Sequence, residues 1–175
     1  MSSKFVYVSY IRSTPEKVWE ALTLPEFTKQ YWFGMVQDCD WKVGSTWQLR
    51  GENGVMDSGH IVEIDKPRRM VISWHHQKMP EFHADGPTLC TIELEAKDDQ
   101  VKLSIHHECA KDDAKVIGAV AGGWPQVISS LKTLLETGTA MHRKASPNPA
   151  YPSRFSRARL TSSFKGSAVL KISRA

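Results

Sequence analysis

The longest amphipathic helical pattern runs from Gly122 to Gly138, and it constrains the fold more than any other segment. Its apolar residues recur at spacings of three and four, which places them on one helical face: Trp124, Val127, Ile128, Leu131, Leu134 and Leu135. We expect Pro125 in the first turn, where its missing N–H costs nothing, and Gly138 as a left-handed C-terminal cap. Since most of the remaining ordered chain reads as strands, the apolar face of this helix must cover a sheet.

Strand patterns account for most of the chain before this helix. The first strand is expected at residues 4–12, and two short helices that begin with prolines follow, through about residue 31. About five further strands are predicted by alternating or β-branched segments at residues 46–50, 55–64, 69–76, 88–94 and 101–107. Residues 77–87 are expected to form a loop, and residues 112–121 a short helical lead-in. Short turns join successive strands, so they should pair antiparallel, and the predicted class is α+β.

Charge divides the chain into two parts. The net charge is +4, but residues 139–175 hold eight Lys or Arg and no Asp or Glu. Residues 1–138 therefore carry 15 basic against 19 acidic residues. We interpret 1–138 as one domain and 139–175 as a basic, disordered tail. Nucleic acid or an anionic surface is a possible partner only through this tail, and a solvated extension without a partner is favoured over that role.

Composition excludes several classes of protein. No window holds the roughly twenty apolar residues that a membrane span needs, and residues 1–5 show no apolar signal-peptide segment. Three widely spaced cysteines without a CxxC motif favour free thiols and a cytoplasmic location: Cys39, Cys90 and Cys109. Because Gly122 and Gly123 lack the rest of a phosphate-binding motif, and nothing else indicates a cofactor, none is expected.

A set of short motifs carries a resemblance to a known family. In order, they are Ser13–Thr23 with Pro25-Glu26 and Trp32, then Asp40–Ser45, Gly59–Arg69, Ser73-Trp74 and Gly123–Gly138. Their order and spacing, from about Phe5 to Gly138, resemble the SRPBCC (START-like, Bet v 1-like) superfamily. More narrowly, they are similar to bacterial relatives of the C-terminal domain of activators of heat-shock-protein-90 ATPase.

The resemblance implies a helix-grip fold, in which a curved antiparallel sheet wraps around a long C-terminal helix with a cavity between them. It also implies binding of a small hydrophobic or amphipathic ligand in that cavity. One alternative is an enzyme of cyclase, dehydratase or hydrolase type that acts on such a ligand there. Another is a protein-interaction module that contacts a chaperone ATPase. The family has no universal catalytic residues, so no catalytic residue is assigned, and a binding protein is favoured over an enzyme.

The expected cavity lining follows from strand alternation and from the helix face. It consists of Trp32, Trp47, His60, Val62, Ile72, Trp74, His76, Ile105, His107, Trp124, Ile128 and Leu131. Leu49 is the alternative to Trp47 on its strand. A filled core built from the same residues is the competing interpretation, since apolar stripes more often pack than enclose a pocket.

Polar residues suggest few reactions. His60, His76 and His107 would hold zinc only if their strands were neighbours in register, so no metal is predicted, and a histidine from this set would instead orient the polar end of a ligand. Four residues are candidates for general acid or base if they face the cavity: Glu52, Asp57, Glu93 and His60. Surface carboxylates are commoner, and no nucleophile motif is present.

Overall fold

The computed structural model describes residues 2–141. Most of the predicted tail lies outside these residues, so the domain division and the partners of the tail remain predictions. In chain order the elements are β1 (Ser3–Ile11), α1 (Pro15–Thr23), α2 (Pro25–Tyr31), β2 (Val36–Cys39), β3 (Thr46–Gly51), β4 (Gly54–Asp65), β5 (Arg69–His76), α3 (Pro80–His83), β6 (Thr88–Lys97), β7 (Gln100–Cys109) and α4 (Lys115–Thr137).

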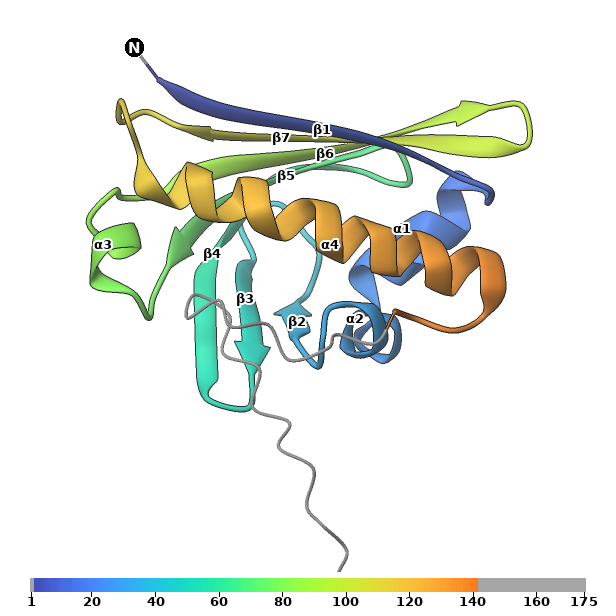
Figure 1. Ribbon diagram of the computed structural model, residues 1–175, viewed down its shortest axis with the longest axis horizontal. Helices are drawn as coiled ribbons and strands as arrows, with labels where there is room; N and C mark the ends of the chain where they lie inside the picture. Colours follow the sequence, from blue (N-terminus) through green and yellow to red (C-terminus); the bar gives the residue numbers. More distant parts are fainter. Residues whose placement is uncertain (1, 142–175) are drawn as a thin grey trace, which may run out of the picture. The chain divides into compact units, whose positions relative to one another are not determined.

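The seven strands form one antiparallel sheet in the order β1-β7-β6-β5-β4-β3-β2. The sheet is curved, and α4 lies along its hollow side, with α3 near the start of α4 and α1 and α2 near its end (Figure 1). We call the sheet face toward α4 the inner face and the opposite face the outer face. The α+β helix-grip architecture predicted from the sequence is confirmed.

The helix α4 is longer than the sequence pattern predicted. The lead-in expected at residues 112–121 is continuous with it from Lys115, so Pro125 lies in the helix interior and not in its first turn. A proline there cannot donate to the carbonyl of Ala121, which removes one bond of the helical ladder. Gly138 ends the helix as predicted, with φ of 78° and its N–H bonded to the Leu134 carbonyl at 2.8 Å.

Two short elements were not predicted. The strand β2 has a polar sequence, VQDC, whose single buried residue is Gln37, so it lacks the apolar alternation that indicates a strand. Gln37 is held by hydrogen bonds, because its amide donates to the Leu22 carbonyl at 2.6 Å and accepts from the Trp47 indole at 2.8 Å. The four-residue helix α3 lies inside the predicted loop at residues 77–87.

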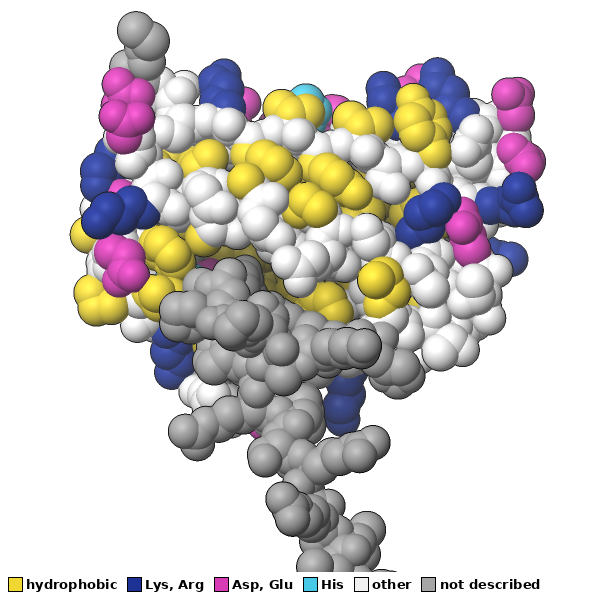
Figure 2. Space-filling model, viewed as in Figure 1, with side chains coloured by type: hydrophobic (Ala, Val, Ile, Leu, Met, Phe, Trp, Pro, Cys, Tyr) yellow, Lys and Arg dark blue, Asp and Glu magenta, His cyan; other side chains and the backbone are white. Residues whose placement is uncertain are grey.

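Charged side chains are scarce on the side of the molecule formed by α4 and β1. No Asp, Glu, Lys or Arg occurs between residues 116 and 131 of α4. On β1, Val6, Val8 and Tyr10 point to the outer face and are exposed. Figure 2 shows hydrophobic side chains across the middle of this side, with charged side chains gathered toward its two ends. This side therefore has the composition of a surface that can contact another molecule.

Candidate functional site

A cluster of four tryptophans occupies the interior between the sheet and α4. Trp74 on β5 contacts Trp47 on β3, with ring centroids 4.3 Å apart, and Trp124 on α4 at 5.8 Å. Trp32, directly after α2, lies 5.3 Å from Trp124 and 6.2 Å from Trp74. All four side chains are buried. Rings at these separations stabilise one another beyond the burial of their area, so the cluster joins sheet, α2 and α4.

Gly59 makes the closest of these ring contacts possible. It lies on β4, between Trp47 on β3 and Trp74 on β5, and pairs with both. Since glycine has no side chain, the two indoles meet over the middle strand. A Cβ at this position would lie 1.7 Å from the Ser73 carbonyl oxygen, so the backbone of β5 also requires a glycine here. Gly59 was not predicted as an interior residue, because its place between the two tryptophans depends on the pairing of three strands.

His107 on β7 belongs to a series of hydrogen bonds that runs beside this cluster from Trp124 to the Trp74 carbonyl. The Trp124 indole N–H donates to His107 Nδ1 at 3.2 Å, so the proton of the neutral ring is on Nε2. His107 Nε2–H then donates to Thr88 Oγ1 at 2.7 Å, and the Thr88 hydroxyl donates to the Trp74 carbonyl at 2.9 Å. Burial lowers the pKa of His107 to about 4. Both ring nitrogens have partners, so His107 stabilises the core as a neutral side chain.

A second inner-face histidine, His76, has only one of its two ring nitrogens in a hydrogen bond. His76 on β5 pairs across the sheet with Asp57 on β4. The ring Nδ1 lies 2.7 Å from Asp57 Oδ1, and the two side chains are only 12% and 10% exposed. The other nitrogen, Nε2, is buried and has no hydrogen-bond partner among residues 2–141. The carboxylate holds the ring in one orientation, and the opposite nitrogen lacks a partner among these residues.

The segment that contains α3 covers His76. Phe82 of α3 places its ring edge-on to the His76 ring, with centroids 5.4 Å apart. His83 Nδ1–H donates to the His76 carbonyl at 2.8 Å, and His75 Nε2–H donates to the His83 carbonyl at 3.0 Å. The rings of His75 and His83 stack at 4.2 Å. Two histidines therefore attach α3 to the end of β5, and Phe82 reaches His76 from there.

Asp85, just after α3, connects this segment to the start of α4. Its side chain is 1% exposed, and its carboxylate accepts a hydrogen bond from Lys111 Nζ at 2.6 Å and one from the Val116 N–H at 2.9 Å. Burial alone would raise the pKa of Asp85, but the hydrogen bonds from Lys111 and the backbone outweigh burial and lower it. Asp85 thus caps the N-terminus of α4, whose own N-cap residue, Ala114, offers no side-chain bond.

Most residues of the predicted lining are buried between the sheet and α4. These are Trp32, Trp47, Ile72, Trp74, Ile105, His107, Trp124, Ile128 and Leu131, while His76 is half-buried at the end of β5. Leu49, the alternative to Trp47, is buried on the same face of β3. Whether these residues bind a ligand stays a prediction, since burial alone is also what a packed core would show.

The predicted placement of His60 and Val62 needs correction. His60 is exposed on the outer face, because its neighbours Gly59 and Ile61 are the inner-face residues of β4. Val62 is half-buried at an irregularity in the pairing of β4 with β5, between Ile61 and Glu63. An apolar side chain at position 59 would have shown that the odd-numbered residues of β4 face the interior. Because Gly59 has no side chain, the even-numbered residues were predicted to face it instead.

The three histidines considered for zinc do not converge. His107 is fully buried on the inner face, whereas His60 is exposed on the outer face. Among residues 2–141, no group of three or more His, Cys, Asp or Glu side chains is placed to hold a metal ion. Of the four acid–base candidates, Asp57 is the one that the structure places on the inner face.

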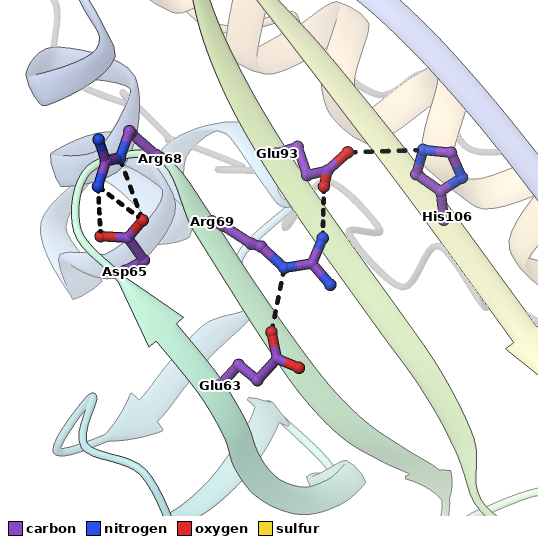
Figure 3. A network of polar contacts seen from close by, with 6 residues as sticks. All are labelled: Glu63, Asp65, Arg68, Arg69, Glu93 and His106. Atoms are coloured by element: carbon purple, nitrogen blue, oxygen red, sulfur yellow. Dashed lines mark hydrogen bonds and ion pairs between the residues drawn. The ribbon is translucent and has the colours of Figure 1, made fainter.

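Glu93 belongs instead to a charged network on the outer face. Figure 3 shows Arg69 of β5 between Glu63 of β4 and Glu93 of β6, with His106 of β7 near the other oxygen of Glu93. The bond from Arg69 Nε to Glu63 measures 3.1 Å, and His106 Nε2 is 3.8 Å from Glu93. Glu52 is exposed in the turn between β3 and β4. Neither glutamate reaches the interior.

Two further buried polar atoms have no partner within residues 2–141: the Tyr31 hydroxyl at the end of α2 and the Ser130 hydroxyl on α4. Both side chains are completely buried. Burial raises the pKa of Tyr31, so its hydroxyl stays protonated and can donate a hydrogen bond. With His76 Nε2, three unpartnered polar atoms lie on elements that border the interior.

Comparison with known proteins identifies the family. The model of the family described as activator of Hsp90 ATPase homolog 1-like protein matches residues 12–136. The chain belongs to this family. This agrees with the SRPBCC resemblance drawn from the sequence motifs. No curated protein sequence matches the chain.

Several solved structures share the fold. An HSP90 activator from Plasmodium falciparum is 22% identical, covers 76% of this chain and 96% of its own, and has a TM-score of 0.64. The Aha1 dimer from Colwellia psychrerythraea is 24% identical, and the match covers 78% of this chain and 98% of that one with a TM-score of 0.62. CalU16 from Micromonospora echinospora is 20% identical, and the match covers 78% of each chain with a TM-score of 0.63. At these identities the likeness establishes the fold alone.

None of the helices in residues 2–141 is long and apolar enough to cross a membrane.

Proposed function

We propose that this family member binds a small hydrophobic or amphipathic molecule in the interior between the sheet and α4. One observation carries the proposal: an aromatic interior bordered by three buried polar atoms that have no partner within the described part of the chain, His76 Nε2 and the hydroxyls of Tyr31 and Ser130. Such atoms are uncommon in folded proteins, and each needs a compensating partner. A ligand with one or two polar groups would supply such a partner.

The chemistry of the surrounding side chains agrees with that ligand class. An orphaned buried donor or acceptor costs roughly 1–3 kcal/mol, which a bound polar group would recover. Apolar ligand surface would add about 25 cal/mol for each Å² that leaves water. The tryptophan cluster offers ring faces and edges for such contacts. His107 does not take part as a polar contact, because both of its nitrogens are already bonded.

The binding proposal is tested by native mass spectrometry and thermal-shift screening of the full chain against fatty acids, sterols and aromatic polyketides. We expect at least one class to bind and raise the melting temperature. Ile128→Ala, in the fully buried α4 face, should weaken that binding, while Val8→Ala on the exposed face of β1 should not. If no class bound, or if both variants bound as wild type does, the interior would not be the ligand site.

A second candidate function is chaperone contact. The family is named for activation of the Hsp90 ATPase, and a structural relative is an HSP90 activator. The exposed apolar side chains of the edge strand β1, Val6, Val8 and Tyr10, form the surface that would make this contact. Val8→Asp should abolish Hsp90 capture and ATPase stimulation if this function holds, while ligand binding in the interior persists. Absence of capture by the wild-type chain would exclude it.

The cellular compartment is part of the same proposal. All three cysteines are free, and two of them, Cys90 and Cys109, are buried. Burial raises the pKa of the Cys90 thiol, which keeps it protonated and unreactive. Unpaired thiols favour a reducing compartment, so we assign the protein to the cytoplasm.

A further inference from the structure

We propose that Asp57 and His76 form a proton-accepting pair for a ligand that carries an acidic hydroxyl, a phenol or an enol, on an aromatic or conjugated framework. The inference rests on the proposed function, because it names the chemical class of the ligand and the group that receives its proton. It arises from His76, an inner-face histidine that has a charged partner on one nitrogen and, among residues 2–141, no partner on the other.

The hydrogen bond to Asp57 determines which nitrogen can act. An ionised carboxylate only accepts hydrogen bonds, so His76 Nδ1 carries the proton that lies between them at 2.7 Å. In the neutral ring, Nε2 then presents a lone pair. That atom is buried and has no partner within residues 2–141. The lone pair is therefore an acceptor that is oriented but unused.

The neighbouring strands explain why this nitrogen has no protein partner. The last residue of β5 paired with β6 is Trp74, which lies opposite Thr88, the first residue of β6. His76 comes two residues later on the same face and has no β6 residue beside it. The hydroxyl of Thr88, at the start of β6, is already bonded to His107 of β7 and to the Trp74 carbonyl. The sheet thus ends next to His76, and the α3 segment occupies the adjoining position through Phe82.

The surroundings of the pair favour an aromatic ligand. Leu49 on β3 pairs with Asp57 from one side, and Trp74 precedes His76 along β5 on the same face. Phe82 lies edge-on to the imidazole. A planar ring that approached Nε2 would find aromatic edges and faces together with one charge-assisted acceptor. A sterol or other saturated alcohol would use the apolar contacts, but its hydroxyl is too weakly acidic to give up a proton to an imidazole.

The proton-transfer step is simple and balanced. The O–H bond of the ligand breaks, its proton forms a new N–H bond at His76 Nε2, and the electron pair stays on the ligand oxygen. The imidazolium then lies between two anions, the ligand oxygen at Nε2 and the Asp57 carboxylate at Nδ1. Asp57 is a positioning residue that also stabilises the positive ring, as a carboxylate does for a general-base histidine.

The test uses para-nitrophenol, whose phenol and phenolate absorb at different wavelengths, with the full chain at a pH where the free probe is mainly protonated. We expect binding to wild type to convert probe to phenolate. His76→Asn keeps an N–H for Asp57 but has no atom at Nε2, and should weaken binding roughly ten-fold. Asp57→Asn keeps a hydrogen-bond acceptor without its charge, and should lose most of the phenolate signal. His60→Asn, the same substitution on the exposed outer face of β4, should match wild type.

The outcomes separate the two proposals. Probe bound equally by wild type and His76→Asn, or bound as neutral phenol, would overturn the proton-accepting pair and leave interior binding intact. If neither this phenol nor any ligand of the screen bound, both the proton-accepting pair and ligand binding in the interior would be excluded. ¹⁵N NMR of the histidines gives a second reading that does not depend on a variant's folding. It should show His76 protonated on Nδ1 alone before the probe is added and on both nitrogens afterwards. A free protein with the proton on Nε2 would also overturn the pair.

Discussion

His107 and His76 both face the interior, on β7 and β5, yet their surroundings give them opposite properties. His107 is fully enclosed, and each of its nitrogens has a fixed partner, Trp124 or Thr88. His76 is bound on one side by Asp57, and its other nitrogen has no partner in the part of the chain that the structure describes. A satisfied buried network gives rigidity, whereas a half-satisfied one lowers stability unless something else binds there. The comparison therefore separates a buried histidine that completes the core from one that, under the proposal, receives a ligand.

The sharpest test of the comparison is the same substitution at both positions. His107→Asn loses half of a fully buried ring and the bond to Thr88, so it should reduce the free energy of unfolding by about 2–4 kcal/mol. His76→Asn retains the bond to Asp57 and removes an unpartnered nitrogen, so we expect a loss below about 1.5 kcal/mol. Urea unfolding of both variants measures the difference. Equal losses would mean that the two histidines play the same structural role.

Acid should destabilise the protein through His107. Its pKa of about 4 in the folded protein lies below the ordinary value of about 6.5, so the unfolded chain binds the proton first as pH falls. The stabilisation from this residue is complete above about pH 6.5 and is lost progressively toward pH 4, by on the order of 3 kcal/mol. Urea unfolding across this range should show a steeper decline for wild type than for His107→Asn. Parallel curves would contradict the assignment of a neutral, buried His107.

The smallest of these effects tests the hydroxyl that completes the His107 network. Thr88→Val has nearly the same shape but leaves His107 Nε2–H without an acceptor, which should cost about 1–3 kcal/mol. Thr88→Ser keeps the hydroxyl and serves as the matched control, with a smaller loss from the missing methyl. Thermal unfolding of the two variants gives the comparison. If Thr88→Val were as stable as Thr88→Ser, the network would not account for the rigidity of this region.

The sequence correctly predicted which residues face the interior on strands where apolar or aromatic side chains mark every second position. Ile72, Trp74 and His76 on β5, and Ile105 and His107 on β7, face the interior as their period of two predicted. The face of α4 that begins at Trp124 was predicted in the same way from its helical period. These patterns depend only on local geometry, so no neighbouring strand had to be known.

The prediction failed where the decisive information was a contact between strands. Gly59 has no side chain, so the inner row of β4 was assigned to His60 and Val62. The pair of Asp57 with His76 depends on the register of β4 against β5, which a hairpin turn and an irregular pairing set together. Thr88 acts through His107, 19 residues further along the chain. Phe82 reaches His76 from the α3 segment, which was predicted to be a loop, and no local pattern marks either residue.

The tryptophans that meet over Gly59 also give the protein an internal optical reporter. Trp47 and Trp74 lie close enough for their indole transitions to interact, and Trp32 and Trp124 extend the same group. Near-ultraviolet circular dichroism and fluorescence should therefore report on the interior beneath α4 more than on the protein surface. A molecule that entered that space would change these signals directly, so occupancy could be followed without a label and before its identity is known.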